Sequence, residues 1–245
     1  VADQATCTSA LLASTLPGAG ARGIAISLDS QAEGSAAVRL DGELLLDDFS
    51  IRVVNGTYGI FSTTPYSGAI QNGLLIGGKV GLQVDGDLLV QSCTVDSASM
   101  AGMVLSNDNA LVQNCVVTNA FLGAHAIVGF GVGRVLCSIT YPGDIIGVRV
   151  VYGNSQSDPL YRDPPAGDYS LRADSYGSPE CNPSGALIGN YPVSYFGGTL
   201  ARDTIVRRQD LDVVSDVAIP SGMTLTILPG GGLTFPEGTK LEVNG

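Results

Sequence analysis

The chain repeats one short stretch three times, as Val90-Gln91-Ser92-Cys93-Thr94-Val95, as Val112-Gln113-Asn114-Cys115-Val116-Val117 and, more loosely, as Arg134-Val135-Leu136-Cys137-Ser138-Ile139. The three cysteines follow one another at a constant spacing. A period of about twenty residues, built from short β-branched runs and Gly, Asn or Asp turns, is typical of a β-solenoid. The stretch from Asp85 to Val150 therefore predicts stacked strands, and we call one complete coil of the stack a rung.

The same register extends toward the N-terminus through 46–51 and 70–75. Side chains two residues apart in a strand point the same way, so stacked rungs should form inward-facing columns. A further strand in each rung places His125 in the slot of Met103 and Val148, where we expect a packed histidine without catalytic partners. The two expected inward columns are Phe49, Gly73, Cys93, Cys115, Cys137 and Ile51, Leu75, Val95, Val117, Ile139.

Composition supports an all-β protein and excludes several partners. Among 245 residues there are 33 glycines, no tryptophan and a net charge of −11. Glycine and β-branched residues favour strands and tight turns over helices. A nucleic-acid partner is not expected because phosphate binding needs a basic face. No membrane span is expected either, because no apolar run reaches the roughly 20 residues that one requires.

Four segments are predicted. Residues 1–154 should form a right-handed parallel β-helix of six or seven rungs with about 22 residues each. Residues 155–192 are rich in proline, which cannot donate to a central ladder, and are interpreted as an irregular cap over the exposed end. Residues 193–203 read as a linker. Residues 204–245 read as a β-arm of short rungs, because 219–227 resembles 235–243 at a shorter spacing than that of the cysteines.

Three passages resemble secreted bacterial right-handed parallel β-helix proteins with pectate-lyase-like folds. Residues 36–150 resemble their repeats, 157–179 resembles the segment that closes such helices, and 217–227 resembles the narrow rungs that open them. The resemblance implies a fold and an extracellular or cell-surface location, and fold alone does not imply an activity. The order departs from the family, because the opening rungs come last.

This displaced order suggests a structural function. We expect a secreted subunit that assembles head to tail into an extracellular filament, with its β-arm completing the first rungs of the next copy by strand addition. Three alternatives stay open: an arm that completes its own chain in a monomeric surface or carbohydrate-binding module, a polysaccharide-lyase-like enzyme, and one module cut from a tandem array. The residues expected to mediate assembly are Ile219, Leu225, Ile227, Leu233, Phe235, Leu241, Val243 and Cys7.

Acidic residues on neighbouring rungs are the weak candidates for a metal site. Asp85, Asp87 and Asp108 could supply oxygen ligands to Ca²⁺. Lyases of the resembled family pair such a cluster with a basic residue, and Lys79, the nearest one, lies across a strand. We therefore interpret these residues as corner residues chosen for backbone reasons. No cofactor and no catalytic residue are expected, and the pairing of Cys7 with Cys181 stays open.

Overall fold

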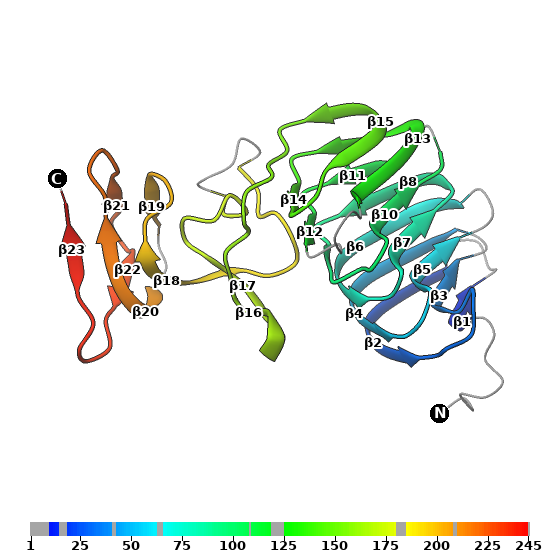
Figure 1. The fold of residues 1–245 in the computed structure, drawn as a ribbon, viewed down its shortest axis with the longest axis horizontal. Coiled ribbons are helices and arrows are strands. Elements are labelled where there is room, and N and C mark those ends of the chain that lie inside the picture. Colours follow the sequence, from blue (N-terminus) through cyan, green and yellow to red (C-terminus); the bar gives the residue numbers. More distant parts are fainter. Residues whose placement is uncertain are drawn as a thin grey trace. The chain divides into compact units, whose positions relative to one another are not determined.

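A computed structural model of the protein describes residues 10–14, 19–40, 43–62, 66–107, 109–118, 125–179, 185–207 and 210–244. These residues are mostly strands and the turns that join them, and the helical element among them is one 3₁₀ turn, Pro164–Ala166. The chain divides into two compact units, residues 1–157 with 188–190, and residues 158–187 with 191–245 (Figure 1). We describe each unit separately.

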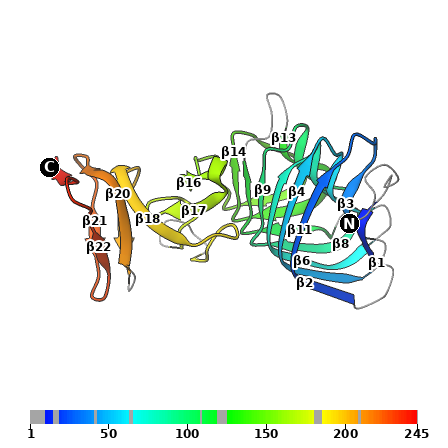
Figure 2. The same cartoon turned by 90° about the horizontal axis from the view of Figure 1, so that it is seen from below.

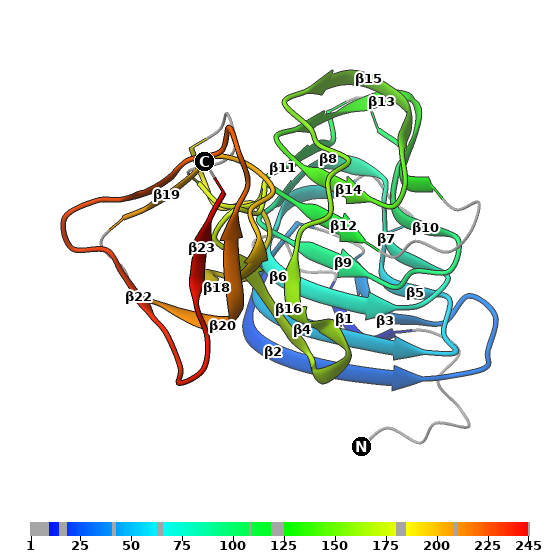
Figure 3. The same cartoon turned by 60° about the vertical axis from the view of Figure 1, so that its left-hand side comes forward.

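The first unit is a solenoid whose strands stack in parallel on three sides (Figure 3). Long strands turn a corner and so contribute to two sides, as β2, β4 and β6 do on the second and third sides. The strands of the first side are β1 (Ala10–Ser14), β3 (Ala36–Leu40), β5 (Tyr58–Ser62), β7 (Val80–Val84), β10 (Ala101–Leu105) and the start of β13 (His125–Leu136).

The second side is formed by the first parts of β2 (Ala19–Asp29), β4 (Leu44–Val54) and β6 (Tyr66–Gly77), followed by β8 (Gly86–Gln91), β11 (Leu111–Gln113) and the end of β13. The third side is formed by the later parts of β2, β4 and β6, followed by β9 (Thr94–Asp96), β12 (Val116–Thr118) and β14 (Ile139–Tyr141). Strand β15 (Ile145–Tyr152) pairs with β13 on the first two sides.

The rung length agrees with the sequence prediction. Ala36 pairs with Tyr58 and Tyr58 with Val80, so one rung is as long as the spacing between successive cysteines of the repeat. All strand pairs described in this unit are parallel, because each strand meets its equivalent in the next rung and never a hairpin partner. The predicted all-β fold with a parallel β-solenoid is confirmed.

One corner, between the second and third sides, repeats the same backbone conformation in every rung. Its residues have φ values between 48° and 65°, the left-handed region that costs most side chains roughly 1–2 kcal/mol. Gly, Asn and Asp tolerate this region best, which explains the short polar residues in the repeat. The column consists of Gly23, Asp48, Asn72, Ser92, Asn114, Cys137 and Gly153.

The predicted inward columns are right for four rungs and wrong for the last. Cys93 and Cys115 are fully buried free thiols in the core. Cys137, however, occupies the left-handed corner, and Ser138 takes the next slot, where its hydroxyl accepts a hydrogen bond from the Cys115 amide at 3.1 Å. Val117 likewise pairs with Thr140 and not with Ile139. The reason is one additional residue in this rung, which shifts its register by one position.

The second unit is also built mainly from parallel strands (Figure 2). Strand β17 (Asp168–Arg172) pairs antiparallel with β16 (Tyr161–Asp163) and parallel with β18 (Val193–Thr199). Strand β18 pairs with β20 (Asp210–Ile219), whose first part pairs with β22 (Gly232–Thr234) and whose last part pairs with β23 (Leu241–Val243). Strand β19 (Thr204–Val206) pairs with β21 (Leu225–Ile227).

Two expectations for this region are wrong. Residues 193–199 are not a linker but strand β18, which stacks between β17 and β20. The spacing between 219–227 and 235–243 is not a rung, because Ile219 pairs with Val243 and not with Phe235. What repeats at this spacing is a proline turn, since the carbonyls of Pro220 and Pro236 each accept a hydrogen bond from an amide within the same turn.

Residues 155–192, expected as a cap, are divided between the units. Residues 158–187 begin the second unit, with Tyr169 buried between Tyr161 and Tyr191. Residues 188–190 belong to the first unit, where the Gly189 amide donates to the Asn114 carbonyl at 2.7 Å. The Asn190 amide donates to the Thr94 hydroxyl at 3.2 Å, so residues 188–190 lie against the third side of the solenoid.

The first prediction concerns thiol reactivity. Burial raises the pKa of the Cys93 thiol well above its usual value, and Cys115 is equally buried, whereas Cys137 is half-buried at the corner. The thiolate is the reactive form, so native-state labelling followed by mass spectrometry should modify Cys137 at least about tenfold faster than the other two. Labelling of Cys115 as fast as Cys137 would contradict the core assignment.

The second prediction concerns the corner column. Asn114→Val should lower the free energy of unfolding of the first unit by roughly 1–2 kcal/mol, because a β-branched side chain resists a φ of 52°. Asn114→Gly is the matched control and should change stability by much less, since glycine adopts this φ freely. Equal losses for both variants in denaturant unfolding would show that the asparagine side chain and not the backbone conformation matters.

Candidate assembly site

Of the acidic residues proposed for Ca²⁺, Asp87 has a side-chain partner in the structure. Asp87 accepts a hydrogen bond of 2.9 Å from the Asn109 side chain on the next rung, and Asn107 accepts one from the Asn109 amide. Asp108 lies outside the described residues. In the described part of the chain, no group of three or more His, Cys, Asp or Glu side chains could hold a metal ion. Asp87 lies in β8, and its hydrogen bond links two neighbouring rungs.

His125 differs from its prediction in slot and surroundings. It pairs with Ala101 and not with Met103, because the rung from Ala101 to His125 is longer than the rung from Val80 to Ala101. Its side chain is 42% exposed, and its Nδ1 lies 2.6 Å from Oδ1 of Asp144. Sequence reasoning missed Asp144 because it follows the turn at Gly143 and belongs to no repeat. The pair ties the start of β13 to the chain entering β15.

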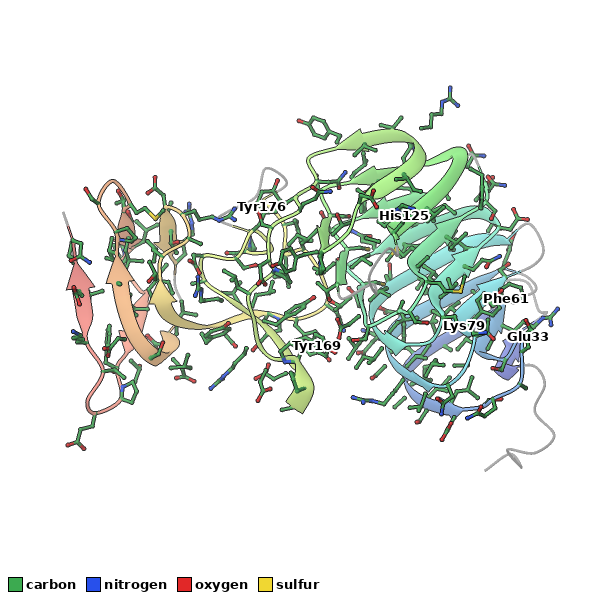
Figure 4. All side chains as sticks on the ribbon, viewed as in Figure 1. Glu33, Phe61, Lys79, His125, Tyr169 and Tyr176 are labelled. Atoms are coloured by element: carbon green, nitrogen blue, oxygen red, sulfur yellow. The ribbon has the colours of Figure 1, made fainter. Side chains whose placement is uncertain are left out.

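Lys79 does not join this histidine. Lys79 precedes Val80, and Val80 pairs with Ala101, which in turn pairs with His125, so the two side chains lie two rungs apart (Figure 4).

The last rung of the second unit is formed by β21, β22 and β23, and we call it the open rung. Four of its apolar residues continue columns that are buried one rung earlier. The pairs are Val206 with Ile227, Leu211 with Leu233, Val217 with Leu241, and Ile219 with Val243. The earlier members of these pairs are all buried. The columns therefore run from a packed core to the end of the unit.

In the open rung itself three of these columns end in exposed side chains, and Leu233 is partly buried. Ile227, Leu241 and Val243 are 46%, 45% and 65% exposed, and Phe235, which follows β22, is 36% exposed. Within the described residues, each strand of this rung pairs along one edge only, which leaves the other edge without backbone partners. Such an edge is a template for a further strand. Ile227, Leu241 and Val243 thus combine exposed apolar side chains with open backbone edges. Of the other predicted residues, Leu225 and Leu233 are partly buried, and Ile219 is buried on β20, one rung earlier.

Among the described residues, the first rung of the first unit also has unpaired strand edges. It is formed by β1 and β2, and we call it the entry rung. Strand β1 pairs with β3, and β2 pairs with β4, each along one edge in the part of the chain that the structure describes. Ala21, Ile24 and Ile26 pack against the core but stay partly exposed. Cys7, the remaining predicted assembly residue, lies outside the described residues.

A buried ion pair holds the base of the second unit. Arg172 donates to both carboxylate oxygens of Asp174, at 2.5 and 2.9 Å, and Asp174 is completely buried. Arg172 also donates to the carbonyls of Gly197 and Thr199 on β18, at 3.0 and 3.2 Å, and Asp174 accepts from the Ala201 amide at 2.7 Å. These bonds fix β18 against β17, on which β20 and the open rung are stacked.

Comparisons with known proteins identify no relative: no family model matches the chain, and neither a curated protein nor a solved structure matches it. In the described residues, no helix combines the length and apolar character that crossing a membrane demands.

The third prediction tests this ion pair. Asp174→Ala should lower the free energy of unfolding of the second unit by about 3–5 kcal/mol, because it leaves the largely buried Arg172 without its counter-charge. Hydrogen exchange of peptides from β17 to β20 should rise accordingly. Glu242→Ala, which removes the exposed partner of Lys240, is the control and should cost at most about 1 kcal/mol. Similar losses of stability for both variants would contradict the role of the Arg172–Asp174 ion pair in holding the second unit together.

Proposed function

We propose that the protein is a structural subunit that assembles head to tail into an extracellular filament, with the open rung of each copy covered by another copy. The observation that carries this proposal is the exposure of Ile227, Leu241 and Val243, which continue buried columns and stand on strands with one unpaired edge. The location outside the cell rests on the resemblance to secreted β-helix proteins.

The physical gain from covering this rung is of two kinds. Each large apolar side chain that leaves water contributes roughly 1.5–3 kcal/mol, and Ile227, Phe235, Leu241 and Val243 are all available. The open strand edges gain backbone hydrogen bonds at the same time. Because β21, β22 and β23 are already paired within their own unit, docking does not have to order the arm first. The main cost is then the lost freedom of the whole subunit, about 4–15 kcal/mol.

The contact joins two different surfaces of the subunit, which makes it heterologous. A heterologous contact builds a ring when its rotation closes and an open filament when it does not. Each added copy brings its own open rung, so the same contact can form again and lengthen a filament.

The fourth prediction tests this function with two neighbouring residues. Val243→Lys places a charge on the face to be covered and should abolish assembly, whereas Asn244→Lys makes the same charge change beside it and should leave more assembly. Both positions are exposed, so neither substitution disturbs a packed core. Light scattering and electron microscopy of the purified proteins measure the outcome.

The wild-type chain should form particles that lengthen with concentration. A wild-type protein that stays monomeric at high concentration would contradict the proposal, and it would favour completion of the rung within one chain. Equal assembly by the Val243→Lys and wild-type proteins would also contradict it, because the contact would then lie elsewhere on the subunit.

A further inference from the structure

We infer that the surface that covers the open rung is the entry rung of the next copy, in one defined register in which Leu241 stacks on Ile24 and Val243 on Ile26. This inference rests on the proposed function and adds to it the partner surface and the pairing of individual residues. It follows from the order of sides, the direction of the strands and the position of the corner in each rung.

The order of sides is the same in the two units. In the first unit, the two parts of β6 pair with β8 on the second side and with β9 on the third side. In the second unit, the two parts of β20 pair with β22 and β23 in the same way. Strand β21 precedes β22 as β7 precedes β8. The open rung therefore consists of a first, a second and a third side.

The entry rung has the same three sides in the same order. Strand β1 lies on the first side, and the two parts of β2 lie on the second and third sides. Each side of the open rung therefore has a counterpart: β21 meets β1, β22 meets the start of β2, and β23 meets its end. Every contact is parallel, because the rungs of both units stack in parallel and the entry rung would continue the stack after the open rung.

The corner between the second and third sides sets the register. In β4 the first inward residue after the corner is Phe49, which pairs with Ile24 of the entry rung. In β20 the pairing is irregular between Val213 and Val217, so Val217 is the first inward residue after the corner, and it pairs with Leu241. Aligning the corners places Leu241 on Ile24.

Side-chain size and direction agree with this register. One step further along the third side, Val243 lies on Ile26, and both belong to inward columns. On the second side, the last inward residue of the entry rung before the corner is Ala21. Its partner at the same position in the next rung is the larger Leu46. The small side chain of Ala21 leaves space for the bulky Phe235 of the open rung. Between the inward residues, Glu242 and Ala25 both point outward and are exposed.

Disulfide trapping between copies tests the register at these outward positions. The background protein carries Cys7→Ser, Cys137→Ser and Cys181→Ser and keeps the buried Cys93 and Cys115. One preparation adds Glu242→Cys, and a second adds Ala25→Cys or, as the matched control, Ser27→Cys. Because the two new thiols are on different chains, a disulfide-linked dimer reports contact between copies only.

The two partner positions differ in distance from residue 242. In the inferred register, Ala25 is its direct neighbour at roughly 4.8 Å between strands, within the range of about 4.4–6.8 Å that a disulfide spans. Ser27 is its diagonal neighbour at roughly 7–8 Å, beyond that range. Mixed under mild oxidation, the 242–25 pair should form dimer at least about tenfold faster than the 242–27 pair.

The outcomes distinguish a failure of this inference alone from a failure of the proposed function. Faster trapping at position 27 overturns the register while head-to-tail assembly stands. Trapping at neither position, in preparations that still form filaments by electron microscopy, overturns the entry rung as the partner surface. Trapping at neither position without any filaments overturns the proposed function and the inference together.

Discussion

A parallel β-solenoid satisfies the backbone and apolar groups of each rung through the next rung, so every such stack ends in a surface that still requires cover. In this protein the requirement is visible along single columns. Ile219 is buried, and Val243, its direct partner one rung later, is mostly exposed. At the other end of the chain, Ile24 and Ile26 pack on the core below them and stay partly exposed above. Both rungs thus leave apolar columns partly exposed.

Much of the fold was predictable because the constraint is local and repeated. The constant spacing of the repeat and the burial of Cys93 and Cys115 follow from strand alternation and turn chemistry. Both are visible in the order of residue types within a few positions of the sequence. Cys137 was misplaced because one additional residue shifts its rung, and a cysteine fits both an inward slot and a corner. Nothing in its own identity distinguishes the two. Pairing beyond the corner decides between them.

The candidate site was predicted in composition but not in geometry. The apolar residues Leu241 and Val243 were identified correctly as members of a rung. Their pairing was predicted wrongly from the similarity of 219–227 to 235–243, because what recurs at that spacing is a proline turn and not a rung. The contact between His125 and Asp144 was missed for a related reason. Asp144 belongs to no repeat, so only the folded chain brings it beside the histidine.

Hydrogen exchange measured as a function of protein concentration tests the central claim most directly, because it observes the open rung itself. If another copy covers this rung, amides of β23 and β2 exchange quickly in dilute protein and slow together as concentration rises, while those of β7 and β10 stay protected throughout. Exchange in β23 that is fast at every concentration would contradict the claim. Slow exchange in β23 that does not depend on concentration would contradict it too, because the cover would then come from the same chain.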